Sequence, residues 1–186
     1  MLKKQLRLDF TELRHKISFS DLSNYSLDIA NNLLGIPIWH YSYYHIFLSI
    51  TEKKELDTSS ILSILQGKDK NIILPKMGLN NSLTHYLLTD NTVIKKNKWN
   101  VPEPIDGIEV PAKNIEVVFI PLLAFDLNGN RVGYGKGFYD VFLKECKPNV
   151  IKVGLSLFEA VEKITDVNDF DIPLDYCVTP TKTYSF

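Results

Sequence analysis

The stretch Pro121–Asp140 decides the fold, and it reads PLLAFDLNGNRVGYGKGFYD. The run before it, Ile115–Ile120 (IEVVFI), is apolar and rich in β-branched residues, which is typical of a strand buried on both faces in a parallel sheet. After it, apolar residues at helical spacing from Phe138 predict a helix that begins near Lys136. The stretch is therefore a strand-to-helix connection, where α/β sheets bind ligands.

The second half of this connection has the composition of an anion-binding loop. Gly133, Gly135 and Gly137 alternate, so that backbone N–H groups can approach a ligand with no Cβ in the way. Successive N–H groups beside a helix N-terminus form a concavity that binds anions. Arg131 and Lys136 add positive charge, and the loop therefore predicts a phosphate site.

Three other interpretations of this loop explain less of it. Asn128-Gly129 is typical of a solvated tight turn, but a turn leaves three further glycines unexplained. The loop is not a Walker A motif, because Asn130 stands where that motif has its first glycine, nor is it a dinucleotide fingerprint, because the third glycine comes one residue early. Asp126 and Asp140 bracket the loop and could orient a base or hold a metal.

The order Pro-x-x-Ala-Phe-Asp, then Gly-x-Arg-x-Gly-Tyr-Gly-x-Gly-Phe-Tyr-Asp, resembles the signature of the 5-formyltetrahydrofolate cyclo-ligase (5,10-methenyltetrahydrofolate synthetase) family. The length of 186 residues also suits that family, and implies one domain over residues 1–186. The resemblance implies a three-layer, Rossmann-like fold. Buried strands separated by helical patterns independently predict an α/β fold, a mostly parallel sheet with helices on both faces.

Composition excludes several classes of protein. A hydrophobic content of 45%, with 23% charged residues, is ordinary for a globular protein, and a net charge of −1 predicts binding to neither nucleic acid nor a membrane surface. The longest apolar run, Val117–Phe125, is far shorter than the ~20 residues that span a bilayer, and no signal peptide is visible. Cys146 and Cys177 are too few for a disulfide framework, so we expect a cytoplasmic protein.

Apolar periodicity predicts the other elements. The sequence predicts helices over residues 3–17 and about 20–34, strands over 43–50, 71–75, 150–154 and 174–178, and a partly helical segment over 155–164. On the first helix, Lys3, Arg7 and Arg14 fall within about 40° of one another, beside an apolar stripe that includes Leu13. Periodicity alone favours a solvated basic edge for these three cations.

The resemblance gives several of these residues a role at a nucleotide. In the family an N-terminal Lys-x-x-x-Arg pair reaches the phosphates, and Lys3 with Arg7 has that spacing. The residues expected to bind the nucleotide are Lys3, Lys4, Arg7, Arg131, Val132, Gly133, Tyr134, Gly135, Lys136, Gly137, Phe138 and Tyr139. Among them, Lys136, Arg131 and Tyr139 are expected to act in catalysis.

The resemblance likewise implies a folate site. A Glu-x-x-Thr segment places Glu55 there, and a carboxylate suits the paired N–H donors of a pterin, although a surface carboxylate is the plain alternative. Trp99 could supply a stacking face, or its Pro-rich segment could be a rigid connector. The residues expected to bind the folate are Glu55, Trp99, Tyr134, Gly135, Lys136, Gly137 and Phe138. Many relatives have an aromatic residue where this chain has Met77.

The metal expected from the resemblance is Mg²⁺, which prefers one or two carboxylates together with phosphate oxygens and water. Asp140 closes the glycine loop and is the first expected ligand. Asp169 aligns best as the second, with Asp171 as its nearest rival. None of the four histidines has a partner pattern that suggests catalysis.

The activity implied is conversion of 5-formyltetrahydrofolate, with or without a polyglutamate tail, and ATP into 5,10-methenyltetrahydrofolate, ADP and phosphate. A monomer is expected. Two alternatives remain open on the sequence. One is another phosphate-handling enzyme, such as a sugar-phosphate isomerase or CoA-transferase, for which no general base or nucleophilic glutamate stands out. The other is a folate-binding protein without turnover, which has no need of a metal–phosphate clamp.

Overall fold

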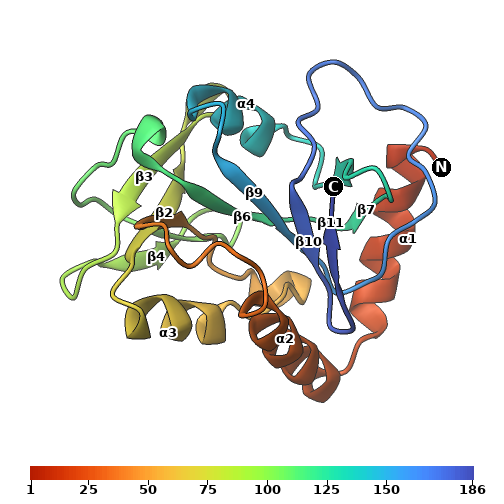
Figure 1. Cartoon of the computed structure of the whole chain (residues 1–186), viewed down its shortest axis with the longest axis horizontal. Coiled ribbons are helices and arrows are strands. Elements are labelled where there is room, and N and C mark those ends of the chain that lie inside the picture. The colour runs from red at the N-terminus through yellow and green to blue at the C-terminus, as the bar shows by residue number, and fades with distance from the viewer.

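The computed structural model describes residues 1–186 and contains one large sheet, two small hairpins and four α-helices (Figure 1). The strands of the large sheet are β1 (Tyr43–His45), β2 (Asn71–Met77), β3 (Leu83–Leu87), β6 (Val117–Pro121), β9 (Ile151–Leu155), β10 (Tyr176–Val178) and β11 (Thr183–Ser185). The hairpins pair β4 (Ile94–Lys96) with β5 (Pro102–Pro104) and β7 (Ala124–Phe125) with β8 (Arg131–Val132). The helices are α1 (Lys3–Lys16), α2 (Phe19–Leu33), α3 (Ser59–Gly67) and α4 (Phe138–Glu145). Single 3₁₀ turns cover Thr51–Lys53, Leu79–Asn81 and Ala112–Asn114.

The large sheet confirms the predicted α/β class. Its order is β11-β10-β9-β6-β1-β2-β3, and only the edge strands β11 and β3 run antiparallel to their neighbours. Helices α2 and α3 cover one face and α4 covers the other (Figure 1). The alternating side chains of β6 show the same division, because Val117 and Phe119 join the core under α2 and α3, whereas Val118 and Ile120 join the core under α4. A strand buried on both faces is what its continuous apolar sequence predicts.

The order of the strands creates a switch point between β1 and β6. From β1 the chain crosses to β2 on one side and returns later to β6 on the other side of β1. The connections that leave the carboxyl ends of these two strands therefore diverge, and the crevice between them is where open α/β sheets bind ligands.

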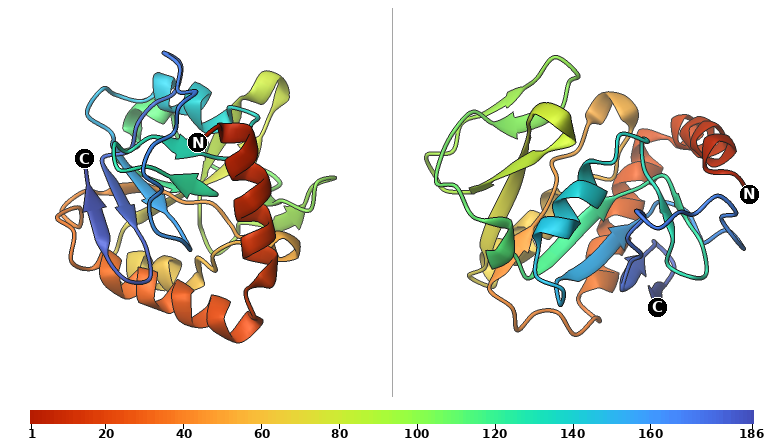
Figure 2. Two further views of the ribbon diagram at one scale, coloured as in Figure 1. Left: turned by 90° about the vertical axis from the view of Figure 1, so that its right-hand side faces the viewer. Right: turned by 90° about the horizontal axis from the view of Figure 1, so that it is seen from above.

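Helix α1 stands at one end of the sheet, beside the β7–β8 hairpin (Figure 2). Leu6 and Phe10 pack there against Val132 and neighbouring apolar residues in a small third core. The predicted inward position of Leu13 is wrong, because this side chain is 43% exposed and Arg14 lies buried instead. The inward face of α1 is thus partly cationic, and those charges need acceptors inside the protein.

Two further expectations need correction. The strand predicted over residues 43–50 ends at His45, and the chain beyond it turns away to line a cavity. Residues 156–164, within the segment predicted to be partly helical, form no helix. They run beside the β7–β8 hairpin instead, where the N–H of Val161 donates to the carbonyl oxygen of Phe125 and the N–H of Ile164 donates to the Asp126 carboxylate. Backbone bonds to a neighbouring segment thus replace helical ones. None of the helices combines the length and the apolar character needed to cross a bilayer.

The rings of His45 and His85 lie side by side in the core, with centroids 5.2 Å apart. Phe142 packs against both, and no ring nitrogen of either histidine has a hydrogen-bond partner in the protein. Burial lowers the pKa of His85 to about 4, and burial followed by the neighbouring His85 lowers the pKa of His45 well below its usual value. Both rings are therefore neutral at neutral pH.

This pair predicts a loss of stability in mild acid. The folded pKa of His85 lies below its unfolded value of 6.5, so the native state binds fewer protons and stability falls as the pH falls from 6.5 towards 4. His85 alone should lower the free energy of unfolding by about 3 kcal/mol across this window. Urea unfolding at several pH values measures the effect, and His85→Leu should flatten the slope. An unchanged slope in His85→Leu would assign the acid sensitivity to other groups.

Candidate active site

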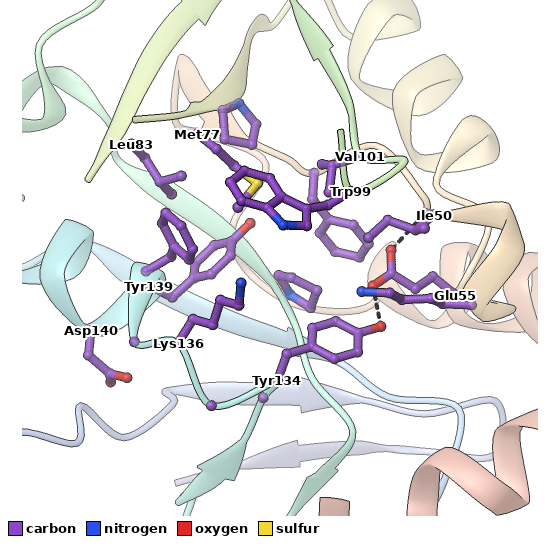
Figure 3. A pocket seen from close by; sticks show the side chains of 18 of the residues that line it. Ile50, Glu55, Met77, Leu83, Trp99, Val101, Tyr134, Lys136, Tyr139 and Asp140 are labelled. Atoms are coloured by element: carbon purple, nitrogen blue, oxygen red, sulfur yellow. Dashed lines mark hydrogen bonds between the residues drawn. The ribbon is translucent and has the colours of Figure 1, made fainter. Parts of the chain in front are cut away.

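A cavity of about 250 Å³ opens at the switch point of the sheet (Figure 3). Its walls come from the carboxyl ends of β1, β2 and β6, from the glycine loop before α4, from the inward edge of α1 and from the β4–β5 hairpin. The lining residues at or beyond the carboxyl ends of these three strands are Phe47, Leu48, Ile50, Pro75, Met77 and Pro121. Segments far apart in the sequence thus meet at one site.

The glycine loop lies against α1 at very short range. Gly135 has φ +88°, and a Cβ added there would lie 3.1 Å from the Arg7 guanidinium. The Nε–H of Arg7 also donates to the carbonyl oxygen of Gly133 at 3.0 Å. Gly137, at φ +73°, is the N-cap of α4. Glycine therefore suits position 135, because it tolerates the positive φ and leaves room for the Arg7 guanidinium.

Five cations line the cavity, and four of them come from α1, β8 and the glycine loop. Lys3 of α1 forms an ion pair with Asp171, and Arg131 of β8 forms one with Asp140 at 2.7 Å and also donates to the carbonyl oxygen of Ile172. The Lys136 ammonium lies across the cavity, 5.0 Å from the centroid of the Trp99 ring. With Arg7, these groups make one side of the cavity strongly basic.

Two carboxylates lie on the same side, and they are Asp140 and Asp171 rather than Asp140 and Asp169. Asp171 lines the cavity, whereas Asp169 is exposed and lies outside it. Burial would raise the pKa of Asp171, but the hydrogen bond and charge of Lys3 hold it below the ordinary value. In both Asp140 and Asp171 one oxygen accepts all the protein bonds and the other has no protein partner. No group of three or more His, Cys, Asp or Glu side chains gathers anywhere in the chain.

Glu55 is the one acid on the opposite side of the cavity, and it is 6% exposed. One carboxylate oxygen accepts the N–H of Ile50 at 2.7 Å, and the other accepts the hydroxyl of Tyr134 at 2.5 Å (Figure 3). Burial and the charge of Glu55 raise the pKa of Tyr134, so its hydroxyl stays protonated. Each oxygen keeps a lone pair for a ligand donor.

The remaining wall is apolar and aromatic. Trp99 is 45% exposed and lies over the cavity, with Met77 and Tyr139 beside it (Figure 3). Burial, and then the charge of Glu55, raise the pKa of Tyr139. Phe47, Leu83 and Phe138 complete this wall. A flat heterocycle with one polar edge matches such a surface, because its faces are apolar and its edge can reach Glu55.

The structure brings most of the expected site residues to this cavity. Those that line it are Lys3, Arg7, Glu55, Trp99, Arg131, Gly133, Tyr134, Gly135, Lys136, Gly137, Phe138, Tyr139 and Asp140. Three lie elsewhere: Lys4 is exposed on α1, Val132 is buried in the small third core, and Asp169 is exposed.

Other lining residues were not found from the sequence. They include Lys53, Leu83 and, after β1, Phe47, Leu48 and Ile50. Only Phe47, Leu48 and Ile50 carried a usable signal, because they stand in the last part of the segment predicted as a strand (residues 43–50), and α/β sheets bind ligands at the ends of their strands.

These features define an α/β protein with one cavity at the switch point of its sheet, in which a glycine loop and several cations face an aromatic wall. Comparison with known proteins agrees with this class. A 5-formyltetrahydrofolate cyclo-ligase from Haemophilus influenzae is 28% identical over 92% of this chain and 94% of its own length. The enzyme of that name from Escherichia coli is 31% identical over 76% and 79%.

A solved structure and a family model extend this agreement. The 5,10-methenyltetrahydrofolate synthetase of Aquifex aeolicus superposes with a TM-score of 0.81 at 27% identity, over 100% of this chain and 93% of that one. The model of the 5-formyltetrahydrofolate cyclo-ligase family matches residues 1–180. The chain therefore belongs to the 5-formyltetrahydrofolate cyclo-ligase family.

The contact between Gly135 and Arg7 predicts a specific defect. Gly135→Val places a β-branched side chain at positive φ and against the guanidinium, so the loop must shift away from α1. We expect ATP affinity to fall at least about tenfold, the scale of one lost charged contact, while the fold persists. Calorimetric titration with ATP and a circular dichroism melt measure the two effects.

Gly133→Ala is the matched control for the fold, because its φ is ordinary and no protein atom lies within 4 Å of the added Cβ. Its melting temperature should equal that of the wild type. Normal ATP affinity in Gly135→Val would remove this loop from the nucleotide site.

Proposed function

We propose that this protein catalyses the ATP-dependent cyclisation of 5-formyltetrahydrofolate to 5,10-methenyltetrahydrofolate, with release of ADP and phosphate. The observation that carries the proposal is a single cavity with two unlike sides. One side is basic and lined by glycines, and the other is aromatic and holds one buried carboxylate. Such a cavity suits two substrates, a polyphosphate and a pterin, that must meet.

The basic side suits the nucleotide. Gly133, Gly135 and Gly137 carry no side chain, and a phosphate can therefore approach the backbone N–H groups of this loop closely. Lys3, Arg7, Arg131 and Lys136 supply positive charge for the transferred phosphoryl group. Phosphoryl transfer needs mainly positioning and charge stabilisation, which agrees with this set of residues.

The aromatic side suits the folate. The Glu55 carboxylate can accept paired N–H donors from the amino-pyrimidine edge of a pterin, as carboxylates do in bidentate pairs. Trp99 offers a face to the flat ring, and Met77 fills the place where many relatives carry an aromatic residue. We also propose that the folate substrate can carry a polyglutamate tail and that the enzyme is a monomer.

The chemistry accounts for why both sides share one cavity. The formyl oxygen attacks the γ-phosphorus of ATP, the bond from that phosphorus to the β-phosphate oxygen breaks, and ADP leaves. The former formyl carbon is now an electrophile that bears a phosphate leaving group. N10 of the same folate attacks this carbon, an intramolecular step favoured by proximity. Loss of the N10 proton to solvent and departure of phosphate with the former formyl oxygen complete the methenyl bridge.

The residues also fit a magnesium ion that accompanies ATP. Asp140 and Asp171 each present one carboxylate oxygen without a protein partner on the basic side of the cavity. Mg²⁺ commonly uses one or two carboxylates with phosphate oxygens and water. Bound there, it would supply charge neutralisation for the β- and γ-phosphates. Asp171 replaces Asp169 in this proposal because only Asp171 lines the cavity.

The direct test is a spectroscopic assay with purified protein, 5-formyltetrahydrofolate and Mg-ATP. New absorbance from the methenyl product that depends strictly on ATP supports the proposal. Folate binding without product would favour a folate-binding protein, and absence of folate binding would favour another phosphate-handling enzyme. The Glu55→Gln substitution should lower the affinity for folate more than the affinity for ATP.

Lys136→Ala should lower turnover by about 10²–10³, the scale for losing one donor that stabilises charge in the transition state. The ammonium lies inside the cavity, and folate affinity should change much less. Lys144→Ala is the control, because Lys144 is exposed on α4 outside the cavity. Wild-type turnover in Lys136→Ala would place this lysine outside the reaction.

The carboxylates can be separated by three matched substitutions. Asp140→Asn and Asp171→Asn keep the side-chain shape and should each raise the Mg²⁺ concentration that the enzyme requires by about 10–100-fold. Asp169→Asn should titrate like the wild type, because Asp169 is exposed outside the cavity. Activity measured against Mg²⁺ concentration gives the Mg²⁺ requirement of each of the three variants. A defect in Asp169→Asn with a normal Asp171→Asn would restore Asp169 as the second ligand.

A further inference from the structure

Arg14 of α1 is a buried cation next to the site, and it does not itself line the cavity. Arg14 is 5% exposed, and it takes part in none of the ion pairs in the chain. One guanidinium nitrogen donates to the carbonyl oxygen of Leu122 at 2.7 Å, and another donates to the hydroxyl of Tyr134 at 2.8 Å. A buried charge without a counter-charge is costly, so what lies beyond Tyr134 matters.

The donors and acceptors in the hydrogen bonds from Arg14 through Tyr134 to Glu55 can be assigned in only one way. A guanidinium can only donate, so the oxygen of Tyr134 is the acceptor and its single proton points onward. That proton goes to Glu55, 2.5 Å away. Glu55 is 6% exposed and carries the charge that Arg14 lacks nearby. The chain Arg14–Tyr134–Glu55 thus joins a buried cation to a buried carboxylate through a neutral hydroxyl.

This chain fixes the orientation of the Glu55 carboxylate. One oxygen is held by the Tyr134 hydroxyl and the other by the N–H of Ile50, so the carboxylate plane cannot rotate without breaking a bond (Figure 3). Tyr134 is itself placed by Arg14, which is anchored at Leu122 directly after β6. Removing Arg14 would leave the Tyr134 hydroxyl free to turn.

We propose that Arg14 is a positioning residue for the folate, acting through the Tyr134 hydroxyl to hold Glu55 in the orientation that receives the pterin. This inference rests on the proposed function, because it takes Glu55 as a folate contact. The competing role is packing alone, in which Arg14 would secure α1 against the loop and affect stability without affecting the folate selectively.

The experiment compares Arg14→Met, Tyr134→Phe and the double variant by separate titrations with 5-formyltetrahydrofolate and with ATP. Each single substitution should weaken folate binding by about tenfold, the scale of one hydrogen bond to a charged group, and should change ATP binding by less than about twofold. The double variant should bind folate no more weakly than the weaker single variant, because both act through one bond. Lys16→Met, an exposed cation on the same helix, should bind both ligands normally.

Several outcomes would overturn this role. Wild-type folate affinity in Arg14→Met, additive losses in the double variant, or equal losses for ATP and folate would each leave packing as the explanation. If Arg14→Met does not fold, Arg14→Lys keeps the buried charge and enters the same cycle. As a single substitution, Arg14→Lys should weaken folate binding. Combined with Tyr134→Phe, it should weaken folate binding no further, and additive losses of folate affinity would equally overturn the role.

A measurement without any ligand separates this inference from the proposed function. The ¹³C chemical shift of the Glu55 carboxyl carbon, assigned with Glu55→Gln, should change in Arg14→Met and Tyr134→Phe and stay constant in Lys16→Met. An unchanged shift in the first two would overturn the positioning role whatever the ligand is. A wild-type protein that binds no folate would instead overturn the proposed function.

Discussion

The active site depends on one close approach, between the Arg7 guanidinium and the backbone at Gly135, where a Cβ would lie 3.1 Å from the cation. Glycine accommodates both this distance and the positive φ at position 135, because it has no Cβ. The contact joins α1 to the loop before α4, and it brings the cationic edge of α1 to the carboxyl ends of the central strands. Lys3 and Arg14 follow the same edge, so that a helix with an exposed outer face carries a basic, buried inner one.

The balance of charge inside the cavity has a consequence for ligand binding. Lys3 and Arg131 are paired with Asp171 and Asp140, but each aspartate uses a single oxygen for its bonds to the protein. The cations are thus held in place before a ligand arrives, and a metal-bound polyphosphate can share the same charges. Glu55 stands apart from this cluster on the aromatic side, held by Ile50 and Tyr134. In the proposed function, these separate positions of the two kinds of acid would keep the nucleotide surface and the folate surface distinct.

Local sequence predicted the fold and the loop well, because buried strands and alternating glycines are short-range patterns. It placed Gly135, Lys136 and Asp140 at the cavity for that reason. Burial across the fold was less predictable. Arg14 lies in the inward position that periodicity predicted for Leu13, because the Tyr134 hydroxyl of the loop accepts a hydrogen bond from its guanidinium there. Asp169 and Asp171 are two residues apart in an irregular segment, and only tertiary structure decides which one reaches the cavity.

Isotope transfer tests most directly whether the cavity brings the formyl oxygen to the γ-phosphorus of ATP, as we propose. The enzyme would be given Mg-ATP and 5-formyltetrahydrofolate labelled with ¹⁸O in the formyl group, and the phosphate released would be examined by mass spectrometry. The account predicts one ¹⁸O atom in each phosphate and none in ADP. Label that appears in water, with unlabelled phosphate, would contradict phosphorylation of the formyl oxygen and with it the joint use of the two sides of the cavity.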